Sequence, residues 1–355
     1  VIHTLVSPNE TTNGDFGSAV GSLPDVNSDG VDDIVVGALG ESLLQGKSYI
    51  FDGASGALLR TLNSPTPITG GQFGFSVSGV PDTNGDGRGD VVVGAYKEDP
   101  GDSPYDAGRV HLFDGSTGEL IFSLQSPDEG IASGARWFGY VIRGSDDING
   151  DGRGETLVGE IYGGPGTSGQ VHIFSGSNGD LLYTLVSPNE EPDGSAAFAI
   201  PVVDDLNGDG APDLVVGAPN ENPTPSIGGR AYIYHSPFPS VDMSPTTLDF
   251  PDQDPIDGPT SSLVATITNT ATDTLQITEV EIVGTDADQF TITGDSGEAS
   301  IGVGLSRTVD VAFDPSSLGD KKAKLRFVSH SFVWQTDLVG VSAETPLAVE
   351  NWNLY

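Results

Sequence analysis

The chain of 355 residues contains no cysteine, one methionine and five histidines. Without cysteine, neither a disulfide framework nor thiol chemistry is available, so local reinforcement must come from bound ions or from topology. No apolar run approaches the length of a membrane span, and the first residues do not form a signal peptide. Helical periodicity is also missing from every long window, whereas glycine is abundant at 49 residues. These features favour an all-β chain of two or three domains.

Positive charge is scarce as well. The chain has 14 basic and 51 acidic residues, and its formal net charge is -37. Nucleic acids and anionic membranes both require a positive face on the protein, so neither is expected as a partner, and membrane insertion is not expected. His111 and His172 occupy strand positions that tyrosines fill in other repeats, and we interpret them as strand packing. His3 and His235 have no repeated acidic or serine partner, which argues against a catalytic triad or a zinc site.

Oxygen-bearing side chains recur at fixed positions in a nine-residue pattern. The clearest copy is Asp82-Thr-Asn-Gly-Asp-Gly-Arg-Gly-Asp90. Side-chain oxygens stand at positions one, three, five and nine, the seventh residue contributes its backbone carbonyl, and glycine at position six permits the sharp turn. This spacing is typical of a loop that binds a hard cation. Four copies, each followed by an apolar strand, therefore predict up to four calcium ions, one for each loop.

The predicted calcium ligands are Asp25, Asn27, Asp29, Val31 and Asp33 in loop 1; Asp82, Asn84, Asp86, Arg88 and Asp90 in loop 2; Asp147, Asn149, Asp151, Arg153 and Glu155 in loop 3; and Asp205, Asn207, Asp209, Ala211 and Asp213 in loop 4. Asp146 and Asp204, which precede loops 3 and 4, form acidic pairs with the first ligands. Such pairs can serve as acid and base in sugar cleavage, but here one member of each pair begins a cation loop.

Each loop lies within a longer repeat of about 60 residues, the size of a repeated supersecondary module. Four runs with strand character recur, and the second repeat shows them all: Phe73–Val77, Val91–Ala95, Arg109–Phe113 and Leu120–Leu124. The run after the loop is apolar on both faces, which is typical of a buried strand. A pair such as Asp114-Gly115 follows the third run and is typical of a hairpin turn.

The fourth repeat lacks its final run, because Tyr234-His-Ser-Pro-Phe-Pro239 is rich in proline. The missing run is present at the other end of the chain, where Val1–Glu10 closely matches Leu181–Glu190. This arrangement predicts a propeller whose last blade takes its outer strand from the N-terminal residues, since closure leaves only short, protected edges.

Together, the Phe-Gly run, the cation loop and the Val-Val-Gly-Ala strand resemble the FG-GAP repeats of the integrin α-subunit β-propeller and its bacterial relatives. The resemblance covers residues 1–235. It implies a calcium ion in each blade loop and a role in extracellular binding or assembly. Family propellers usually have more blades than the four repeats seen here, the third repeat has Glu155, and the fourth has lost its Phe-Gly pair. The four units could close as a small ring, pair with a second chain, or be part of a longer protein.

Composition changes after a Pro-rich linker at 236–245. Residues 246–345 alternate polar and apolar positions between turn residues, which predicts a β-sandwich of about 100 residues. Thr247-Leu-Asp-Phe250 and Val311-Ala-Phe-Asp-Pro315 resemble the immunoglobulin-like modules of bacterial surface proteins. The tail at 346–355 resembles the linker that precedes the C-terminal sorting domain of proteins exported by type IX secretion.

These features predict a secreted or cell-surface protein, because millimolar calcium is extracellular. A non-enzymatic structural or adhesion role is expected, with self-assembly through strand sharing into an extracellular polymer. The expected partners are further copies of the chain or an extracellular protein or glycan. Two alternatives remain at this stage, a glycan adhesin and a polysaccharide lyase or hydrolase on a propeller scaffold.

Overall fold

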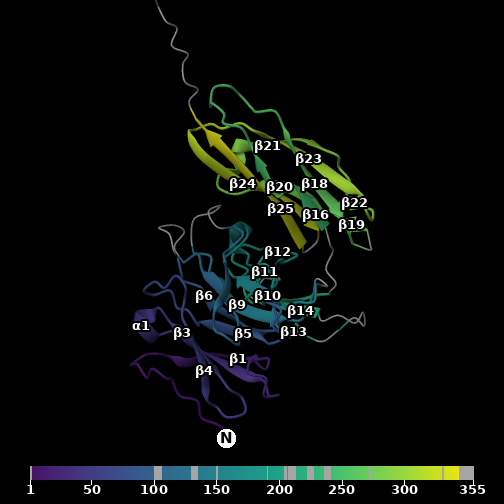
Figure 1. Cartoon of the computed structure of the whole chain (residues 1–355). Helices are drawn as coiled ribbons and strands as arrows, with labels where there is room; N and C mark the ends of the chain where they lie inside the picture. The colour runs from purple at the N-terminus through teal and green to yellow at the C-terminus, as the bar shows by residue number, and fades with distance from the viewer. Residues whose placement is uncertain are drawn as a thin grey trace, which may run out of the picture. The chain divides into compact units, whose positions relative to one another are not determined.

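The computed structural model of the chain describes residues 2–99, 106–128, 135–148, 151–189, 191–203, 206, 213–221, 228–235, 241–271, 274–329 and 332–343 (Figure 1). The chain divides into two compact units, Val1–Phe238 (unit 1) and Pro239–Tyr355 (unit 2). Regular structure in the described residues is almost entirely β-strand, apart from the short helices α1 (Glu41–Leu44), η1 (Pro165–Thr167) and η2 (Ala287–Gln289). The predicted all-β class is thus confirmed.

None of the helices in the described part of the chain combines the length and apolarity needed to cross a membrane.

Unit 1 is built from successive antiparallel sheets, each a meander of strands that are neighbours in the sequence. In the described residues, sheet 1 contains β1 (Phe16–Leu23), β2 (Asp33–Ala38), β3 (Lys47–Phe51) and β4 (Leu58–Leu62); sheet 2 contains β5 (Ser76–Val80), β6 (Asp90–Ala95), β7 (Arg109–Phe113) and β8 (Leu120–Leu124); sheet 3 contains β9 (Phe138–Ser145), β10 (Glu155–Glu160), β11 (Gln170–Ser175) and β12 (Leu181–Val186); and sheet 4 contains β13 (Val202–Val203), β14 (Asp213–Ala218) and β15 (Arg230–Tyr234).

Consecutive sheets of unit 1 pack against one another, with β5 against β1 and β2 and β9 against β5 and β6. The core therefore lies between sheets. Val92 of sheet 2 and Ile142 of sheet 3 are fully buried in one shared cluster. The strands after loops 1 to 3 are buried on both faces as their apolar runs predict, and Val91, Val92 and Val93 are all 0% exposed, whereas Val215 and Gly217 of β14 are only partly buried.

Glycines explain how the sheets approach so closely. A Cβ atom on Gly94, which belongs to a Gly-Ala pair in sheet 2, would overlap the carbonyl oxygen of Gly139, which belongs to the Phe-Gly pair of sheet 3. Gly37 and Gly74 make the same contact between sheets 1 and 2. The Gly-Ala pair of one sheet and the Phe-Gly pair of the next sheet thus form the two sides of one backbone contact.

The described residues of unit 2 form two larger sheets that share one core. One sheet has the order β16 (Val241–Ser244), β18 (Leu263–Asn269), β23 (Ser306–Phe313) and β21 (Phe290–Asp295). The other contains β20 (Glu279–Val283), β24 (Gly319–Ser329) and β25 (Phe332–Ser342), with β17 (Thr247–Asp249) parallel to β25. A short pair joins β19 (Leu275–Gln276) to β22 (Ser300–Ile301).

Side chains from both large sheets of unit 2, among them Ile267, Phe313, Leu325 and Leu338, form its hydrophobic cluster. Strand β16 lies inside the predicted linker 236–245, because Val241 and Met243 pack against this cluster. Residues 236–240 of that linker and the predicted tail at 346–355 lie outside the described residues.

The expected closure of the propeller is not observed in the described part of unit 1. Residues 2–6 form no strand, and β15 pairs with β14 alone. Further along the N-terminal segment, Ser7 and Asn9 donate hydrogen bonds of 2.6 and 3.0 Å to Glu41 in α1, between β2 and β3. These bonds hold the segment at sheet 1.

A pair of glycine substitutions tests the inter-sheet contact. Gly94→Ala should lower the free energy of unfolding by about 1–3 kcal/mol, because its Cβ must displace backbone of the next sheet. Gly302→Ala is the control, since a Cβ there would lie near only the side chain of Leu305, at 3.3 Å, among the described residues. It should change stability by less than about 0.5 kcal/mol. Denaturant unfolding measures both, and equal losses would contradict the packing argument.

Candidate cation-binding loops

The four predicted loops connect the first and second strands of the four sheets. Loops 1 and 2 are described in full. Of the predicted ligands, Asn149 in loop 3 and Asp205, Asn207, Asp209 and Ala211 in loop 4 lie outside the described residues. The sheets thus present the loops at equivalent positions, each immediately before a buried strand.

The first carboxylate of each described loop organises the turn. In loop 1, Asp25 accepts hydrogen bonds from the backbone N–H groups of Ser28 at 2.6 Å and Gly30 at 2.8 Å. Hydrogen bonding favours the ionised form, so the Gly30 N–H holds the pKa of Asp25 below its ordinary value. The first position therefore stays negatively charged even though no side chain pairs with it in the turn.

Loops 2 and 3 repeat this arrangement. Asp82 accepts bonds from Gly85 at 2.5 Å and Gly87 at 2.9 Å, and Asp147 accepts a bond from Gly152 at 2.7 Å. The glycine at position six has a positive φ in each of these loops, for example 83° at Gly87, a conformation that favours glycine. The predicted role of the sixth residue in the turn is therefore explained by its backbone angle.

Positions three and five turn their oxygens inward by the same local bonding. In loop 2, Asn84 accepts the N–H of Asp86 at 2.9 Å, and Asp86 accepts the N–H of Arg88 at 2.8 Å. Each side chain thus binds the backbone two residues further along, the usual Asx-turn geometry. Loop 1 has the same pair of bonds at Asn27 and Asp29, with lengths of 2.9 and 2.8 Å.

The ninth position supplies a buried carboxylate. Asp33 is 1% exposed, whereas Asp90, Glu155 and Asp213 are each 0% exposed. Each accepts the N–H of position two of its own loop; the distance is 2.8 Å from Thr83 to Asp90 and 2.5 Å from Ile148 to Glu155. The longer Glu155 therefore makes the same bond as the aspartates.

In loops 1 and 2, burial removes water from the ninth carboxylate. Loss of water raises the pKa of Asp90 to about 6, although Thr83 and the N–H of Gly115 donate hydrogen bonds to it. The pKa of Asp33 is raised for the same reason. A buried carboxylate that is costly to ionise and lies in an oxygen-rich loop suits a bound cation, which would supply the missing positive charge.

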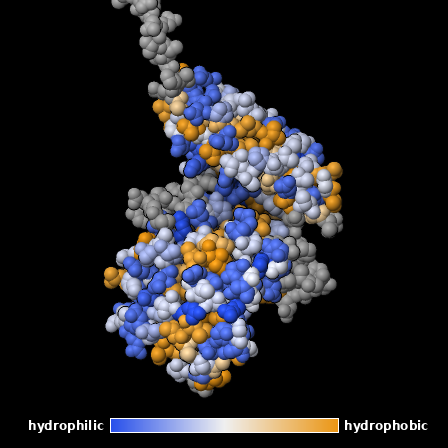
Figure 2. All heavy atoms as spheres, in the orientation of Figure 1, coloured by the Kyte–Doolittle hydropathy of each residue, from blue (hydrophilic) through white to orange (hydrophobic). Residues whose placement is uncertain are grey.

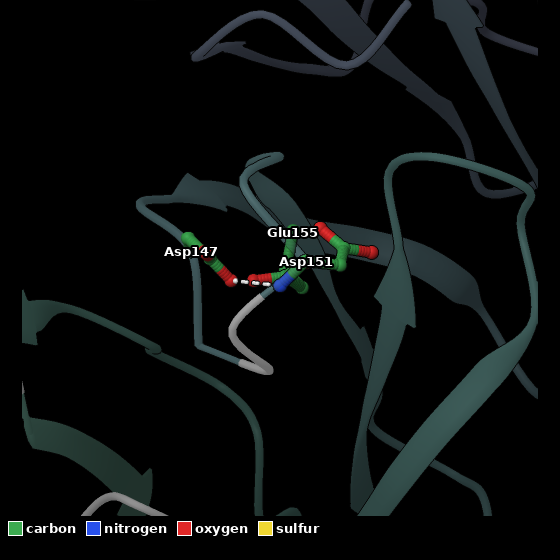
Figure 3. Close-up of side chains that lie close together, drawn as sticks. All are labelled: Asp147, Asp151 and Glu155. Atoms are coloured by element: carbon green, nitrogen blue, oxygen red, sulfur yellow. Dashed lines mark hydrogen bonds between the residues drawn. The ribbon is translucent and has the colours of Figure 1, made fainter.

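In loop 3 the acidic oxygens lie closest together. One carboxylate oxygen each from Asp147, Asp151 and Glu155 lies within 4.8 Å of the others, and the described residues contain no second group of this kind. Figure 3 shows the three side chains, with the hydrogen bond of 3.2 Å from the Asp151 N–H to Asp147 as a dashed line. Oxygen atoms at such separations can share one ion of calcium size.

Arg153 has a contact that its position in the loop did not predict. The seventh residue was expected to contribute only its carbonyl, but the guanidinium of Arg153 lies 2.9 Å from the carboxylate of Asp82 in loop 2. The side chains are 32% and 26% exposed, so water screens much of this attraction. The contact nevertheless joins adjacent loops and brings positive charge to the first ligand of loop 2.

Hairpin serines support the fifth ligand and were also missed from the sequence. Ser116 donates a hydrogen bond of 3.1 Å to Asp86, and Ser177 donates one of 3.1 Å to Asp151. Both serines follow the Asp-Gly or Ser-Gly turn that closes the third strand. The recurrence of serine at this place is the signal that could have identified them.

Buried glutamates form a second set of polar residues that the sequence did not reveal. Glu98 accepts a hydrogen bond of 2.7 Å from Ser64, which follows β4 of the preceding sheet, and lies 3.2 Å from the His111 ring. Glu160 lies 3.0 Å from His172. The histidines, interpreted from sequence as strand packing, thus bind carboxylates that join one sheet to the next.

A sequence signal for these glutamates exists. Glu41, Glu98 and Glu221 each stand four residues after the glycine of a Gly-Ala pair. In sheet 3 the glutamate stands three residues earlier, at Glu160, and its carboxylate fills the space where Gly163 has no side chain. The shift explains why the third repeat reads Gly-Glu-Ile: its alanine is replaced by the residue that makes the inter-sheet bond.

The pH dependence of stability tests this set. Burial acts to raise the pKa of Glu98, but the bonds with His111 and Thr66 outweigh it and hold the pKa below the ordinary 4.5. Because the folded-state pKa is depressed, the stabilisation is complete above pH 4.5 and is lost as the pH falls through the folded value. Unfolding free energy measured in chelator should therefore fall more steeply between about pH 5 and 3 for the unmodified chain than for Glu98→Gln.

The control for this prediction is Glu119→Gln, which alters an exposed hairpin residue. It should leave the pH profile unchanged. Parallel profiles for the unmodified chain and Glu98→Gln would show that Glu98 does not bear the stabilising charge.

Comparison with protein families identifies FG-GAP repeats at residues 16–55, 73–113 and 197–234. The predicted resemblance is thus confirmed for repeats 1, 2 and 4. Repeat 3, with Glu155 and Glu160, lies outside the matched segments.

Curated relatives include integrin α subunits. Integrin alpha-PS5 of Drosophila melanogaster is 35% identical over 210 residues, which cover 57% of this chain and 19% of the relative. Integrin alpha-IIb of Mus musculus is 38% identical over 155 residues, which cover 41% of this chain and 15% of the relative. The chain thus spans less than a fifth of the length of these relatives.

Among solved structures, the VesB protease of Vibrio cholerae aligns with 53% of this chain and 48% of its own at a TM-score of 0.23 and 14% identity. Such a score does not relate the two folds.

The matched segments and the curated relatives together show that the chain contains FG-GAP repeats similar to those of integrin α subunits, carried on sheets that present cation-type loops in series.

Proposed function

We propose that the chain is a calcium-stabilised, non-enzymatic adhesion module that acts at the cell surface or in the extracellular space. The observation that carries this proposal is the repetition of one oxygen-rich loop, with the same internal hydrogen bonds, before the second strand of successive sheets. Loops of merely solvated acids would not need a buried carboxylate at the same position in each copy.

Calcium is the proposed ion because the donors are all oxygen. Each loop offers side-chain oxygens at positions one, three, five and nine and a backbone carbonyl at position seven, contributed by Val31, Arg88, Arg153 or Ala211. Flexible oxygen-rich loops with several carboxylates suit calcium, whereas magnesium demands a tighter octahedral geometry. Up to four ions would bind, and each would offset the charge of a buried carboxylate.

The proposed architecture extends the observed sheets. Sheets 1 to 4 would be FG-GAP blades of a propeller within residues 1–235, and residues 246–345 would form an immunoglobulin-like β-sandwich. The shared core of the two large sheets in unit 2 supports the second assignment. The resemblance of the tail to the linker before a type IX sorting domain supports export.

Integrin α subunits suggest adhesion as the role, since the segments similar to them are FG-GAP repeats. The proposed partner is an extracellular protein, a glycan or a second copy of this chain. Extracellular calcium would keep the loops ordered in that location. Inside a cell, where free calcium is scarce, the same weak sites would stay empty and the buried carboxylates would destabilise the fold.

Thermal unfolding with calcium and then with excess chelator tests the proposed ion. Calcium at 100 times its dissociation constant stabilises by about 2.7 kcal/mol for each site. This corresponds to roughly 5–10 °C in a unit of this size. Asp86→Asn keeps the acceptor for the Arg88 N–H but removes charge, so it should lose one site in calorimetric titration and part of the calcium-dependent shift.

Asp257→Asn, in an exposed turn of unit 2, is the matched control and should behave as the unmodified chain. An unfolding transition that does not move in excess chelator would overturn the calcium proposal.

A cluster of aromatic rings favours a glycan as one class of partner. Trp137 stacks on Tyr140 with ring centroids 5.5 Å apart and an interplanar angle of 16°, and its ring lies 4.8 Å from that of Tyr162. Phe198, which is 48% exposed, lies 6.0 Å from Tyr140. Partly exposed aromatic rings offer an apolar face to a ligand together with polar atoms at their edges.

Binding to an array of neutral and acidic glycans, repeated with Phe198→Ala, tests this candidate. The variant should lose at least half of any specific retention, because it removes the most exposed ring of the cluster. Leu305→Ala, at a residue of unit 2 that is 63% exposed, is the control. Absence of binding, or equal binding by Phe198→Ala, would reject this surface as a glycan site.

A further inference from the structure

One face of sheet 4 is exposed where the same face is buried in the other sheets. Ile50 in β3, Leu112 in β7 and Ile173 in β11 are each 0% exposed. The equivalent residue in β15, Ile233, is 55% exposed. A Cβ on Gly217 likewise meets only its own sheet, whereas Gly37 and Gly94 abut the backbone of the next sheet. Sheet 4 therefore exposes the face that the following sheet covers in sheets 1 to 3.

No strand pairs with the outer edge of sheet 4 among the described residues. In the described residues, β3, β7 and β11 each pair with a following strand, whereas β15 has β14 as its one neighbour. An unpaired edge presents free backbone N–H and C=O groups and is a template for another strand.

Residues 2–6 contact sheet 1 in the way that the fourth strand of a sheet contacts the following sheet. The His3 ring is 3.0 Å from the Cβ position of Gly56 in the hairpin of sheet 1. Arg60 of β4 lies 3.4 Å from that of Gly118 in sheet 2, and Phe122 of β8 lies 3.2 Å from that of Gly179 in sheet 3. The N-terminal segment thus makes the contact that a preceding sheet would make.

The hydrogen bonds that follow agree with this placement. Ser7 donates to Glu41 at 2.6 Å, as Ser64 after β4 donates to Glu98 at 2.7 Å. Yet residues 2–6 pair with no strand among the described residues. Val6 is 58% exposed, whereas its sequence equivalent in β12, Val186, is 1% exposed.

Ile2 is 91% exposed. Figure 2 shows hydrophobic residues on the surface at the end of unit 1 where Figure 1 marks the N-terminus. Among the described residues, residues 2–6 therefore have no strand to pair with, whereas sheet 4 has neither a fourth strand nor a covering sheet.

We propose that residues 2–6 of one copy pair with β15 of a second copy, so that sheet 4 of the second copy packs on sheet 1 of the first. This inference rests on the proposed binding role and names its partner as the chain itself. The added strand would supply main-chain hydrogen bonds, and sheet 1 of the first copy would cover Ile233 and Gly217 of the second.

The register follows from the complete sheets. In sheet 3, Tyr183 pairs with Ile173 and Thr184 with His172. By the sequence match of the two segments, His3 of one copy lies opposite Ile233 of the second, and Thr4 lies opposite Tyr232. Antiparallel neighbours have Cα atoms about 4.5–5.5 Å apart, which a disulfide can bridge.

Charge sets the conditions for assembly. Each copy carries a formal charge of -37, so two copies repel each other at low ionic strength. Salt screens this repulsion and calcium reduces it, and both should therefore promote pairing. Assembly should increase from low salt to about 0.15 M salt, where the Debye length falls to about 8 Å.

A cysteine experiment tests the register directly, because the chain has no cysteine of its own. His3→Cys and Ile233→Cys, prepared as separate proteins and mixed under oxidation with calcium, should give a disulfide-linked dimer on a non-reducing gel. Replacing Ile233→Cys with Leu305→Cys, at an exposed site of unit 2, should reduce the yield at least tenfold. Equal yields would overturn the proposal.

The two substitutions combined in one chain distinguish assembly from ring closure. Crosslinks between copies should give a ladder of multimers, whereas a product of monomer mass with an internal disulfide would overturn the proposal.

Mass in solution, by light scattering with calcium, provides the second measurement. The unmodified chain should form dimers or larger species, and Ile233→Lys should shift it to monomer at the same concentration. Leu305→Lys is the control and should not change the mass. A monomer under all conditions would overturn the inference. Because thermal unfolding in chelator is measured separately, this outcome would leave the calcium proposal standing.

Discussion

The buried carboxylate at the ninth loop position is the constraint on which unit 1 depends. It ends the loop and begins the second strand, and it binds the backbone at position two of the same loop. In sheets 1 and 2 its other oxygen accepts the N–H of a hairpin glycine, Gly53 or Gly115. One side chain therefore ties together the loop, the central strand and the hairpin, and the proposed cation would offset the charge that its burial leaves without water.

Two further contacts turn separate sheets into a series. Backbone meets backbone at Gly94 and Gly139, and the carboxylate of Glu98 binds the serine that follows the previous sheet. Both contacts point from one sheet to the next in chain order. A series built this way has two unlike ends, and in a head-to-tail series the ends complement each other. The proposed assembly would therefore repeat between copies the contact that already joins the sheets within one chain.

Much of the site could be predicted from the residues alone. The spacing of Asp82, Asn84, Asp86 and Asp90 predicts a local turn, because its hydrogen bonds join residues two to seven positions apart. The buried strands could be predicted for the same reason, from runs that are apolar on both faces. The pairing of Arg153 with Asp82 could not, because it joins residues 71 positions apart in different sheets.

By itself the sequence determined the repeats, the cation-type loops, the strands and the match between residues 1–10 and 181–190, since each depends on neighbours along the chain. Only the tertiary structure decided where the N-terminal segment lies. The match predicted a strand beside β15; in the described residues, β15 pairs with β14 alone, and the bond between Ser7 and Glu41, 34 positions apart, holds the segment against sheet 1. Sequence similarity between strands indicates which edge a strand can complete. It does not indicate whether that edge is within reach, because distance in space depends on how the sheets stack.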